Sequence, residues 1–344
     1  MLKVAILSRP NGCFPNVISI GLADLLYQLE ISSEIFYDAI PFLMRMLPMN
    51  EKPAHWSNSL HYRIYNKLRY YQRDKRLLKK LADFDLIVVS ECLPNSLWNN
   101  YLAIEQLRKK SNKKIGSYND GSIDVAPGHR QRLMSMSDKG DERYDFNLFV
   151  SEVIEERLQH KIRNRAVIGL NLEHAGLGPI PKEEFIAIVD FAQQGFESYK
   201  DQQLNVLKGL GIKTIVLEGT YELDEIRRLY KKAAIFFLGS TETFGLPIAE
   251  CLACGAYVFT PDSSWPMAWR LDEHPVSGGP GILPECFKVY NSESELREKL
   301  TELIKTYDSK KTPLKVFDTF LHNYPKFYCG DKKALEELLN KFSS

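Results

Sequence analysis

The chain has 344 residues, of which 44% are apolar and 26% are charged, and its formal net charge is +1. This length predicts two domains, and the near-neutral charge argues against nucleic-acid binding and against a general attraction to membranes. Without a long apolar run or a signal-peptide pattern, and with six scattered cysteines, the sequence predicts a reduced, cytoplasmic protein.

The first half of the chain alternates short apolar runs with helical patterns, which is typical of a parallel sheet covered by helices. The runs that predict strands are Lys3–Leu7, Glu34–Tyr37, Leu86–Ser90, Lys114–Ser117 and Phe146–Val150. The stretches that predict helices are 17–29, 61–81, 97–110 and 152–160.

Gly and Pro break this periodicity over 171–184, which predicts a linker, and a second alternating series follows. Its predicted strands are Phe185–Val189, Thr214–Leu217, Ala234–Leu238 and Tyr257–Thr260, and its predicted helices are 196–208, 223–232, 247–254 and 293–306. We therefore expect an α/β fold of two Rossmann-like domains, 1–175 and 183–325, facing a cleft at the carboxyl ends of their sheets. A terminal helix within 331–344 is expected to pack back on the first domain.

Two loops of the first domain are expected to face this cleft. The loop after the first strand has one glycine where a dinucleotide site needs G-x-G-x-x-G, which argues against a nicotinamide dehydrogenase. In that loop, Asn11 and Gly12 either touch a substrate or form a plain turn. Asp120, which follows the strand beginning at Lys114, either contacts an acceptor hydroxyl or makes the turn.

The segment ETFGLPIAECLACG (242–255) contains a CxxC pair, a spacing found in metal and redox sites. Pro247 is typical of the first turn of a helix and Gly255 of the position just past its end, so Cys251 and Cys254 belong mid-helix among apolar residues. A structural zinc site needs a second ligand pair, and the sequence offers none at suitable spacing. We expect both thiols to be buried core groups.

The same segment contains two acidic residues, Glu242 and Glu250, on either side of a Gly-Leu-Pro turn. The N–H groups and the positive dipole end of the helix that starts there suit phosphate oxygens. Carboxylates accept hydrogen bonds from sugar hydroxyls, so a diphosphate at this turn would have ribose near one glutamate and a hexose near the other. A purely structural explanation is equally good. In it, one residue is a glutamate that the helix dipole favours near the helix start, and the other is an exposed acid in a loop.

The stretch 212–262 resembles the donor-binding segment of GT-B glycosyltransferases, especially the retaining family-4 enzymes. Glu242 and Glu250 match the E-x7-E motif of that family, and ECLACGAYV is similar to the pattern that follows it. The resemblance implies that Glu242 contacts the donor sugar as the catalytic glutamate and that Glu250 contacts the ribose. It also implies that the diphosphate meets the backbone of Phe244, Gly245 and Leu246.

The chain departs from the family pattern at two places. Family members usually carry an Arg and then a Lys-Gly that bind the diphosphate, whereas AQQGFESYKDQ offers only Lys200 for this role. After the strand Tyr257–Thr260, DSSWPMAWR replaces the family's G-G-x-P-E. These departures keep open a rival interpretation, a catalytically inactive subunit that binds a nucleotide sugar or a partner transferase.

The helix predicted at 61–81 is strongly basic and has an apolar stripe with tyrosines. Helices of this kind bind anionic membrane surfaces, although a solvated basic face is the commoner cause of such a pattern. Peripheral contact with the inner face of a membrane is therefore one of two alternatives for this helix.

The resemblance implies a retaining transfer of a sugar from a nucleotide donor such as a UDP- or GDP-sugar to a glycan or lipid-linked acceptor, as in polysaccharide biosynthesis. The second domain is expected to bind the donor and the first domain the acceptor. We expect no cofactor and no obligatory metal, because no Asp-x-Asp motif lies in a suitable context. A nucleotide-sugar epimerase on the same fold is a further alternative.

Overall fold

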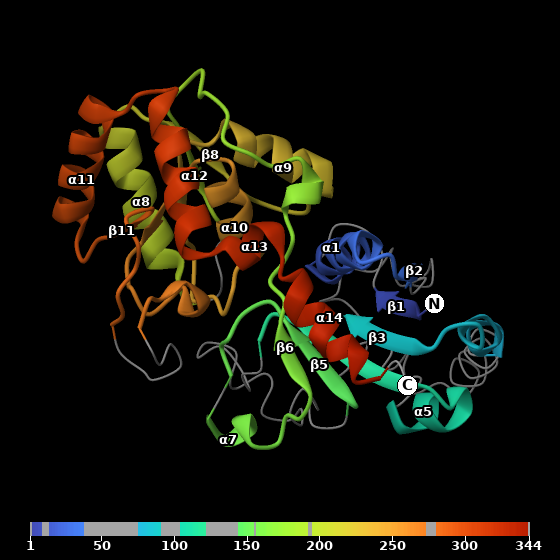
Figure 1. Ribbon diagram of the computed structural model, residues 1–344. Coiled ribbons are helices and arrows are strands. Elements are labelled where there is room, and N and C mark those ends of the chain that lie inside the picture. The colour runs from blue at the N-terminus through green and yellow to red at the C-terminus, as the bar shows by residue number, and fades with distance from the viewer. Residues whose placement is uncertain are drawn as a thin grey trace, which may run out of the picture.

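The chain folds into two lobes, each built on a parallel β-sheet, in the computed structural model (Figure 1). The strands of the first sheet lie within residues 3–167, and those of the second within residues 186–289. Figure 1 places both chain termini in the first lobe. The residues that the structure describes are 2–8, 14–37, 75–90, 104–121, 144–154, 156–191, 195–272 and 280–342.

The first sheet has the strand order β2-β1-β3-β4-β5-β6, and all of its pairings are parallel. Its strands are β1 (Lys3–Ser8), β2 (Ser32–Tyr37), β3 (Leu86–Ser90), β4 (Lys114–Asn119), β5 (Phe146–Phe149) and β6 (Arg165–Val167). The strands β1, β3, β4 and β5 are buried almost throughout, as expected of a sheet with helices on both faces.

The second sheet has the order β11-β10-β9-β7-β8 and is also entirely parallel. Its strands are β7 (Ile186–Val189), β8 (Lys213–Val216), β9 (Ile235–Phe237), β10 (Tyr257–Thr260) and β11 (Phe287–Val289). The predicted α/β fold with two Rossmann-like units is confirmed.

Helices cover both sheets. Around the first sheet lie α1 (Phe14–Gln28), α5 (Ile104–Ser111), α7 (Glu156–Gln159) and α14 (Lys332–Asn340), and residues 75–81 are helical. Around the second lie α8 (Glu197–Gly209), α9 (Leu223–Lys232), α10 (Leu246–Ala253), α11 (Glu293–Thr306), α12 (Lys311–Asn323) and α13 (Pro325–Cys329), with short 3-10 turns at η2 (Glu173–Ala175) and η3 (Met267–Trp269).

Several predicted elements differ from the structure. The predicted helix 152–160 is wrong in its first turn, because 152–154 are not helical and Val153 and Ile154 point into the core. The strands β6 and β11 were not predicted, since each is a three-residue edge strand with too short an apolar pattern. The helices α12 and α13 were also not predicted. Residues 61–74 and 97–103 of the predicted helices lie outside the described residues.

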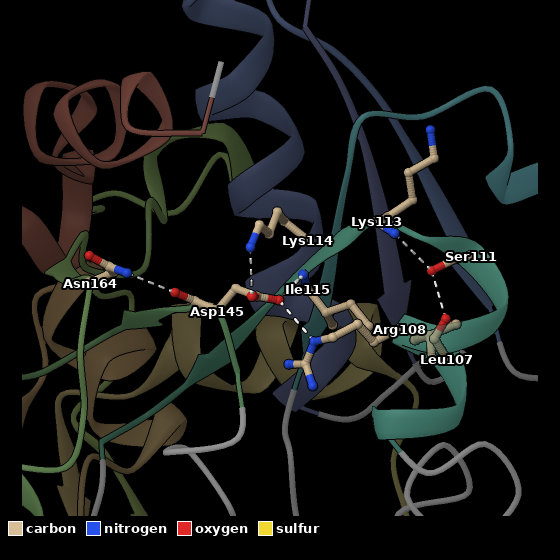
Figure 2. A network of polar contacts seen from close by, with 8 residues as sticks. All are labelled: Leu107, Arg108, Ser111, Lys113, Lys114, Ile115, Asp145 and Asn164. Carbon is tan, nitrogen blue, oxygen red and sulfur yellow. Dashed lines mark hydrogen bonds and ion pairs between the residues drawn. The ribbon is translucent and has the colours of Figure 1, made fainter. Parts of the chain in front are cut away.

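Polar interactions of Asp145 link the amino ends of β4, β5 and β6 (Figure 2). Asp145, just before β5, accepts hydrogen bonds from the Ile115 N–H at 2.9 Å and the Arg108 Nε at 3.3 Å. Lys114 reaches its other oxygen at 3.3 Å, and the Asn164 side chain donates to its carbonyl at 3.0 Å. Burial raises the pKa of Asp145, but these hydrogen bonds and the two cations outweigh burial and bring the pKa below its usual value. This network lies at the edge of the sheet opposite the carboxyl ends of its strands.

The segment that joins the two sheets is anchored by a buried lysine. The Lys182 Nζ donates to the carbonyls of Lys231 at 2.8 Å and Cys254 at 2.7 Å, which lie at the ends of α9 and α10. Carbonyls at helix C-termini carry partial negative charge and lack helical partners, so a buried cation suits them. Burial lowers the pKa of Lys182 to about 8.

The chain crosses between the lobes a second time after α13. There the Leu170 N–H donates to the Lys326 carbonyl at 3.1 Å, and the Asp331 N–H donates to the Ile168 carbonyl at 2.8 Å. Gly169 has a φ of 74°, and a Cβ at this position would lie 1.8 Å from the Lys326 carbonyl oxygen, so only glycine fits. Beyond this crossing α14 packs against β6 and α1 of the first lobe.

The Asp145 network yields a prediction about stability. Asp145→Asn should lower the free energy of unfolding at pH 7 by about 1–3 kcal/mol, because the buried Ile115 N–H and two partly exposed cations lose a charged acceptor. The folded-state pKa is depressed, so this stabilisation exists above the unfolded pKa and is lost as pH falls below about 4. Urea denaturation across pH should show the two proteins converging in acid. The exposed Asp83→Asn serves as the control, and an equal loss in that variant contradicts the interpretation.

Candidate functional site

The second sheet contains a topological switch point between β7 and β9. The chain leaves β7 toward β8 on one side and then returns to β9 on the other side. In open parallel sheets, ligands bind beyond the carboxyl ends of the strands at such a point. The residues that follow these two strands are Asp190 after β7 and the segment 238–245 after β9.

The segment after β9 ends in a turn that starts α10. Gly245 has a φ of 71°, and a Cβ there would lie 2.8 Å from the Ile248 Cδ1, so the position requires glycine. Pro247 occupies the first turn of α10, as the sequence predicted, and no side chain caps this helix terminus. The amino end of α10 therefore keeps the character of an anion site, with backbone amides and the positive end of the dipole.

The backbone of Glu242 is hydrogen-bonded on both sides to the segment after β10. Its N–H donates to the Trp265 carbonyl at 3.0 Å, and its carbonyl accepts from the Met267 N–H at 3.2 Å. Glu242 and Pro266 thus form a parallel β-bridge. The bridge belongs to DSSWPMAWR, the stretch that departs from the family pattern, so this stretch holds the Glu242 turn in place.

The next residues of the turn are held in the same way. The Ala268 N–H donates to the Thr243 carbonyl at 2.9 Å, and the Trp269 Nε1 donates to the Phe244 carbonyl at 2.5 Å. The rings of Trp269 and Phe244 stack with centroids 5.4 Å apart, and both side chains are buried. The Phe244 side chain therefore packs in the core and does not face a ligand, and its carbonyl is occupied by the indole.

Three carboxylates come together at the carboxyl ends of the strands. Glu242 is half-buried, and burial raises its pKa to about 8, with the charges of Asp190 and Asp120 adding to the rise. Asp120 follows β4 of the first sheet, so the two domains meet here. At neutral pH Glu242 holds its proton, and a protonated carboxyl can donate a hydrogen bond as well as accept one.

Asp190 is buried and links the ends of β7 and β9. Its side chain accepts from the Phe191 N–H at 2.8 Å, and the Gly239 amide also hydrogen-bonds to it. Burial raises the pKa of Asp190 to about 7, against the lowering effects of these amides and of the positive charge of Lys200. Lys200 lies in the first turn of α8, and its ammonium is thus near the switch point.

The second glutamate of the motif is paired with an arginine. Glu250 lies inside α10 with its side chain 2% exposed, and Arg227 of α9 contacts its Oε1 through Nε and through a terminal nitrogen, each at 2.7 Å. Burial raises the pKa of Glu250, and Arg227 opposes that rise. The carboxylate is therefore a buried, oriented acceptor and not an exposed loop acid.

The structure brings together most of the residues that the sequence singled out. One turn contains Glu242, Gly245 and Leu246. The charge of Lys200 lowers the pKa of Asp190, and the charge of Asp120 raises that of Glu242, so both residues lie within electrostatic range of the cluster. Asp120 also makes a turn, since its Oδ1 accepts from the Gly121 N–H at 3.0 Å. Asn11 and Gly12 lie outside the described residues.

The cysteine pair belongs to the core, as predicted. Cys251 in α10 and Cys254 just past its end are both fully buried, so the predicted mid-helix position is wrong for Cys254. Burial raises the pKa of both thiols, that of Cys254 to about 11. In the described part of the chain, no group of three or more His, Cys, Asp or Glu side chains is placed to hold a metal ion. The described helices include none long and apolar enough to cross a bilayer.

Three residues of this site were missed by the sequence analysis. Asp190 had a detectable signal, because an acid directly after an apolar strand marks the carboxyl edge of a parallel sheet. Arg227 and Trp269 had none, since each acts on a residue 23 or 25 positions away through tertiary contact alone.

Comparisons with known proteins identify the fold. No protein-family model matches the chain, and no curated protein does. Among solved structures, Anabaena Alr3699/HepE in complex with UDP-glucose matches with a TM-score of 0.51 and 14% identity over 100% of both chains. An alpha-glucosyltransferase (AGT) in complex with UDP matches with a TM-score of 0.57 and 11% identity, also over 100% of both chains.

A third structure carries a different activity on the same architecture. A putative UDP-N-acetylglucosamine 2-epimerase from Listeria monocytogenes matches with a TM-score of 0.56 and 11% identity, over 98% of this chain and 95% of that one. At these identities the similarity shows the fold, which is GT-B. The residues of the site therefore have to carry the functional argument.

The hydrogen bonds that residues 265–269 form with the Glu242 turn predict that Trp269 is more important for stability than its neighbour Trp265. Trp269→Phe should lower the free energy of unfolding by about 1–3 kcal/mol, because the buried Phe244 carbonyl loses its donor. Trp265→Phe is the control, since Trp265 is also a buried indole and packs against Phe196 and Tyr199, but among the described residues no hydrogen bond of its indole N–H is seen. Chemical denaturation of both variants checks this, and equal losses in the two would count against the indole hydrogen bond.

Proposed function

We propose that this protein is a glycosyltransferase that transfers a sugar from a nucleoside diphosphate sugar to a glycan or lipid-linked acceptor with retention of configuration. One observation carries the proposal. The two glutamates of the E-x7-E pattern lie on either side of the uncapped amino end of α10, beside the switch point of a GT-B donor-side sheet. This arrangement supports an anion site at the helix terminus with a glutamate before it and a glutamate after it in the sequence.

In this proposal the diphosphate of the donor binds at the amino end of α10. The backbone amides at Gly245 and Leu246 and the helix dipole stabilise the charge that develops on the leaving diphosphate. Lys200 is proposed as a further phosphate ligand. It approaches from α8, and its positive charge already acts on Asp190 next to this position.

The two glutamates have different proposed roles. Glu250 accepts hydrogen bonds from the ribose hydroxyls, for which a buried and ionised acceptor is suited. Glu242 contacts the donor sugar, where its raised pKa of about 8 lets the carboxyl donate a hydrogen bond to a sugar oxygen at neutral pH. Asp120, from the first domain, is the proposed contact for the acceptor hydroxyl.

A nucleotide-sugar epimerase is the second candidate, because a putative epimerase has the same architecture over nearly the whole chain. Both candidates bind a nucleotide sugar, so binding alone does not separate them. Incubation with UDP- and GDP-sugars separates them by product. A transferase moves the sugar to an acceptor or to water and releases the free nucleoside diphosphate, whereas an epimerase inverts a carbon of the sugar. A protein that binds without turnover would be the inactive partner-binding subunit.

The assigned roles predict different defects in two variants. Glu250→Gln should weaken UDP binding by about 1.5–3 kcal/mol, because a charged acceptor for ribose is lost. Glu242→Gln should leave the affinity for UDP nearly unchanged and slow turnover of the sugar donor. Calorimetry and product release measure the two effects, and Glu298→Gln, on the exposed face of α11, is the control. Wild-type behaviour in both variants would falsify the assignment.

Peripheral membrane contact through 61–81 also stays a prediction, with 61–74 outside the described residues. Each Lys or Arg near an anionic bilayer contributes about 1 kcal/mol, so a basic helix gives reversible docking. The protein should co-sediment with phosphatidylserine vesicles at low salt and dissociate as salt rises. Replacing Arg73, Lys75, Arg76 and Lys79 by Gln should abolish co-sedimentation. Failure of the wild type to sediment would identify the helix as a solvated face.

A further inference from the structure

The guanidinium of Arg227 holds one particular oxygen of Glu250. Its Nε and a terminal nitrogen both contact Oε1, each at 2.7 Å, and the Arg227 side chain is 14% exposed. Within the described residues no other side chain forms a hydrogen bond or an ion pair with the carboxylate, so Oε2 keeps its acceptor capacity. A carboxylate with one oxygen occupied by a fixed cation has a defined orientation, because the planar guanidinium fork allows little rotation.

The surroundings of Glu250 make this cation important for its charge state. Burial disfavours the ionised form, and Arg227 is the cation whose field opposes that effect. The other groups that interact with Glu250 by charge are the Tyr230 hydroxyl of α9 and the thiols of Cys251 and Cys254. Asp190 acts on Tyr230 and Cys251, and the ammonium groups of Lys182 and Lys231 act on Cys254, which follows α10. The pKa of His174 in the connecting segment is lowered by burial and by the charge of Arg227, so the imidazole adds no charge at neutral pH.

We infer that Arg227 is a positioning residue for nucleotide recognition, which favours the charged form of Glu250 and orients its Oε2 toward the ribose hydroxyls of a nucleoside diphosphate. This inference rests on the proposed function, because Glu250 is taken as the ribose acceptor. It assigns the preference for a ribonucleotide to a residue of α9 that lies outside the E-x7-E pattern. A purely structural pair between α9 and α10 would affect stability alone.

The test compares binding of UDP and GDP with binding of their 2′,3′-dideoxy forms in wild type, Arg227→Met and Arg227→Lys. Wild type should bind the ribose form at least about tenfold more tightly, a difference of 1.4 kcal/mol. In Arg227→Met this ratio should fall toward one, while affinity for the dideoxy form changes little. Arg227→Lys keeps a positive charge without the fork and should give an intermediate ratio, and it serves as the informative variant if Arg227→Met folds poorly. Arg228→Met, on the exposed side of the same helix, is the matched control.

A pH profile provides the second measurement. An ionised Glu250 is a stronger acceptor for the ribose hydroxyls than a protonated one. Removal of Arg227 should therefore raise the pH below which UDP affinity falls. The phosphate of UDP, Glu242 and Asp190 titrate in both proteins, so the difference between the two profiles reports Glu250. In Arg227→Lys the shift should be smaller than in Arg227→Met.

The outcomes separate the inference from the proposed function. If wild type binds neither UDP nor GDP, the proposed function is wrong and the role of Arg227 is overturned with it. If wild type binds and the Arg227 variants keep both the ribose preference and the pH profile, only the role of Arg227 is overturned. Loss of stability in Arg227→Met with an unchanged ratio in Arg227→Lys identifies a structural ion pair.

Discussion

Buried backbone groups must find partners, and this requirement fixes the turn that carries Glu242. The turn has no regular structure of its own, and its N–H and carbonyl groups pair with residues 265–269 instead. Trp269, which supplies the indole donor, is packed in turn by Tyr324 and Phe327 from the chain's return crossing. The position of the Glu242 carboxyl and of the amino end of α10 therefore depends on aromatic packing between segments far apart in sequence.

Two groups of carboxyls differ in what surrounds them. Asp145, at the amino edge of the first sheet, and Glu250, inside α10, each form an ion pair with an arginine. Glu242 lies within electrostatic range of Asp190 and Asp120, and burial raises the pKa values of both Glu242 and Asp190. Groups whose pKa is shifted by burial and like charge cost stability, and such clusters occur where a ligand or substrate later supplies the compensation. The contrast supports the carboxyl ends of the strands as the functional region.

The two crossings between the lobes link the domains through contacts of different kinds. In the first crossing, the buried ammonium group of Lys182 donates hydrogen bonds to carbonyls at the C-termini of α9 and α10. In the second, two backbone hydrogen bonds and the close approach at Gly169 join the crossing segments, and α14 then packs on the first sheet. The charge of Asp120, which follows a strand of the first sheet, acts on Glu242 of the second domain, so groups of both domains lie within electrostatic range of one another.

The sequence by itself determined the α/β class, nearly all central strands, and the turn at Gly245 with its two glutamates, because these depend on local periodicity and on residues such as Gly and Pro with restricted or special backbone conformations. It could not predict the edge strands β6 and β11, whose three residues carry too little pattern. It also could not predict that DSSWPMAWR clamps Glu242, that Arg227 pairs with Glu250, or that Asp190 and Asp120 raise the pKa of Glu242. Those facts depend on distances between residues far apart in the chain, and only the packing of the two domains sets such distances.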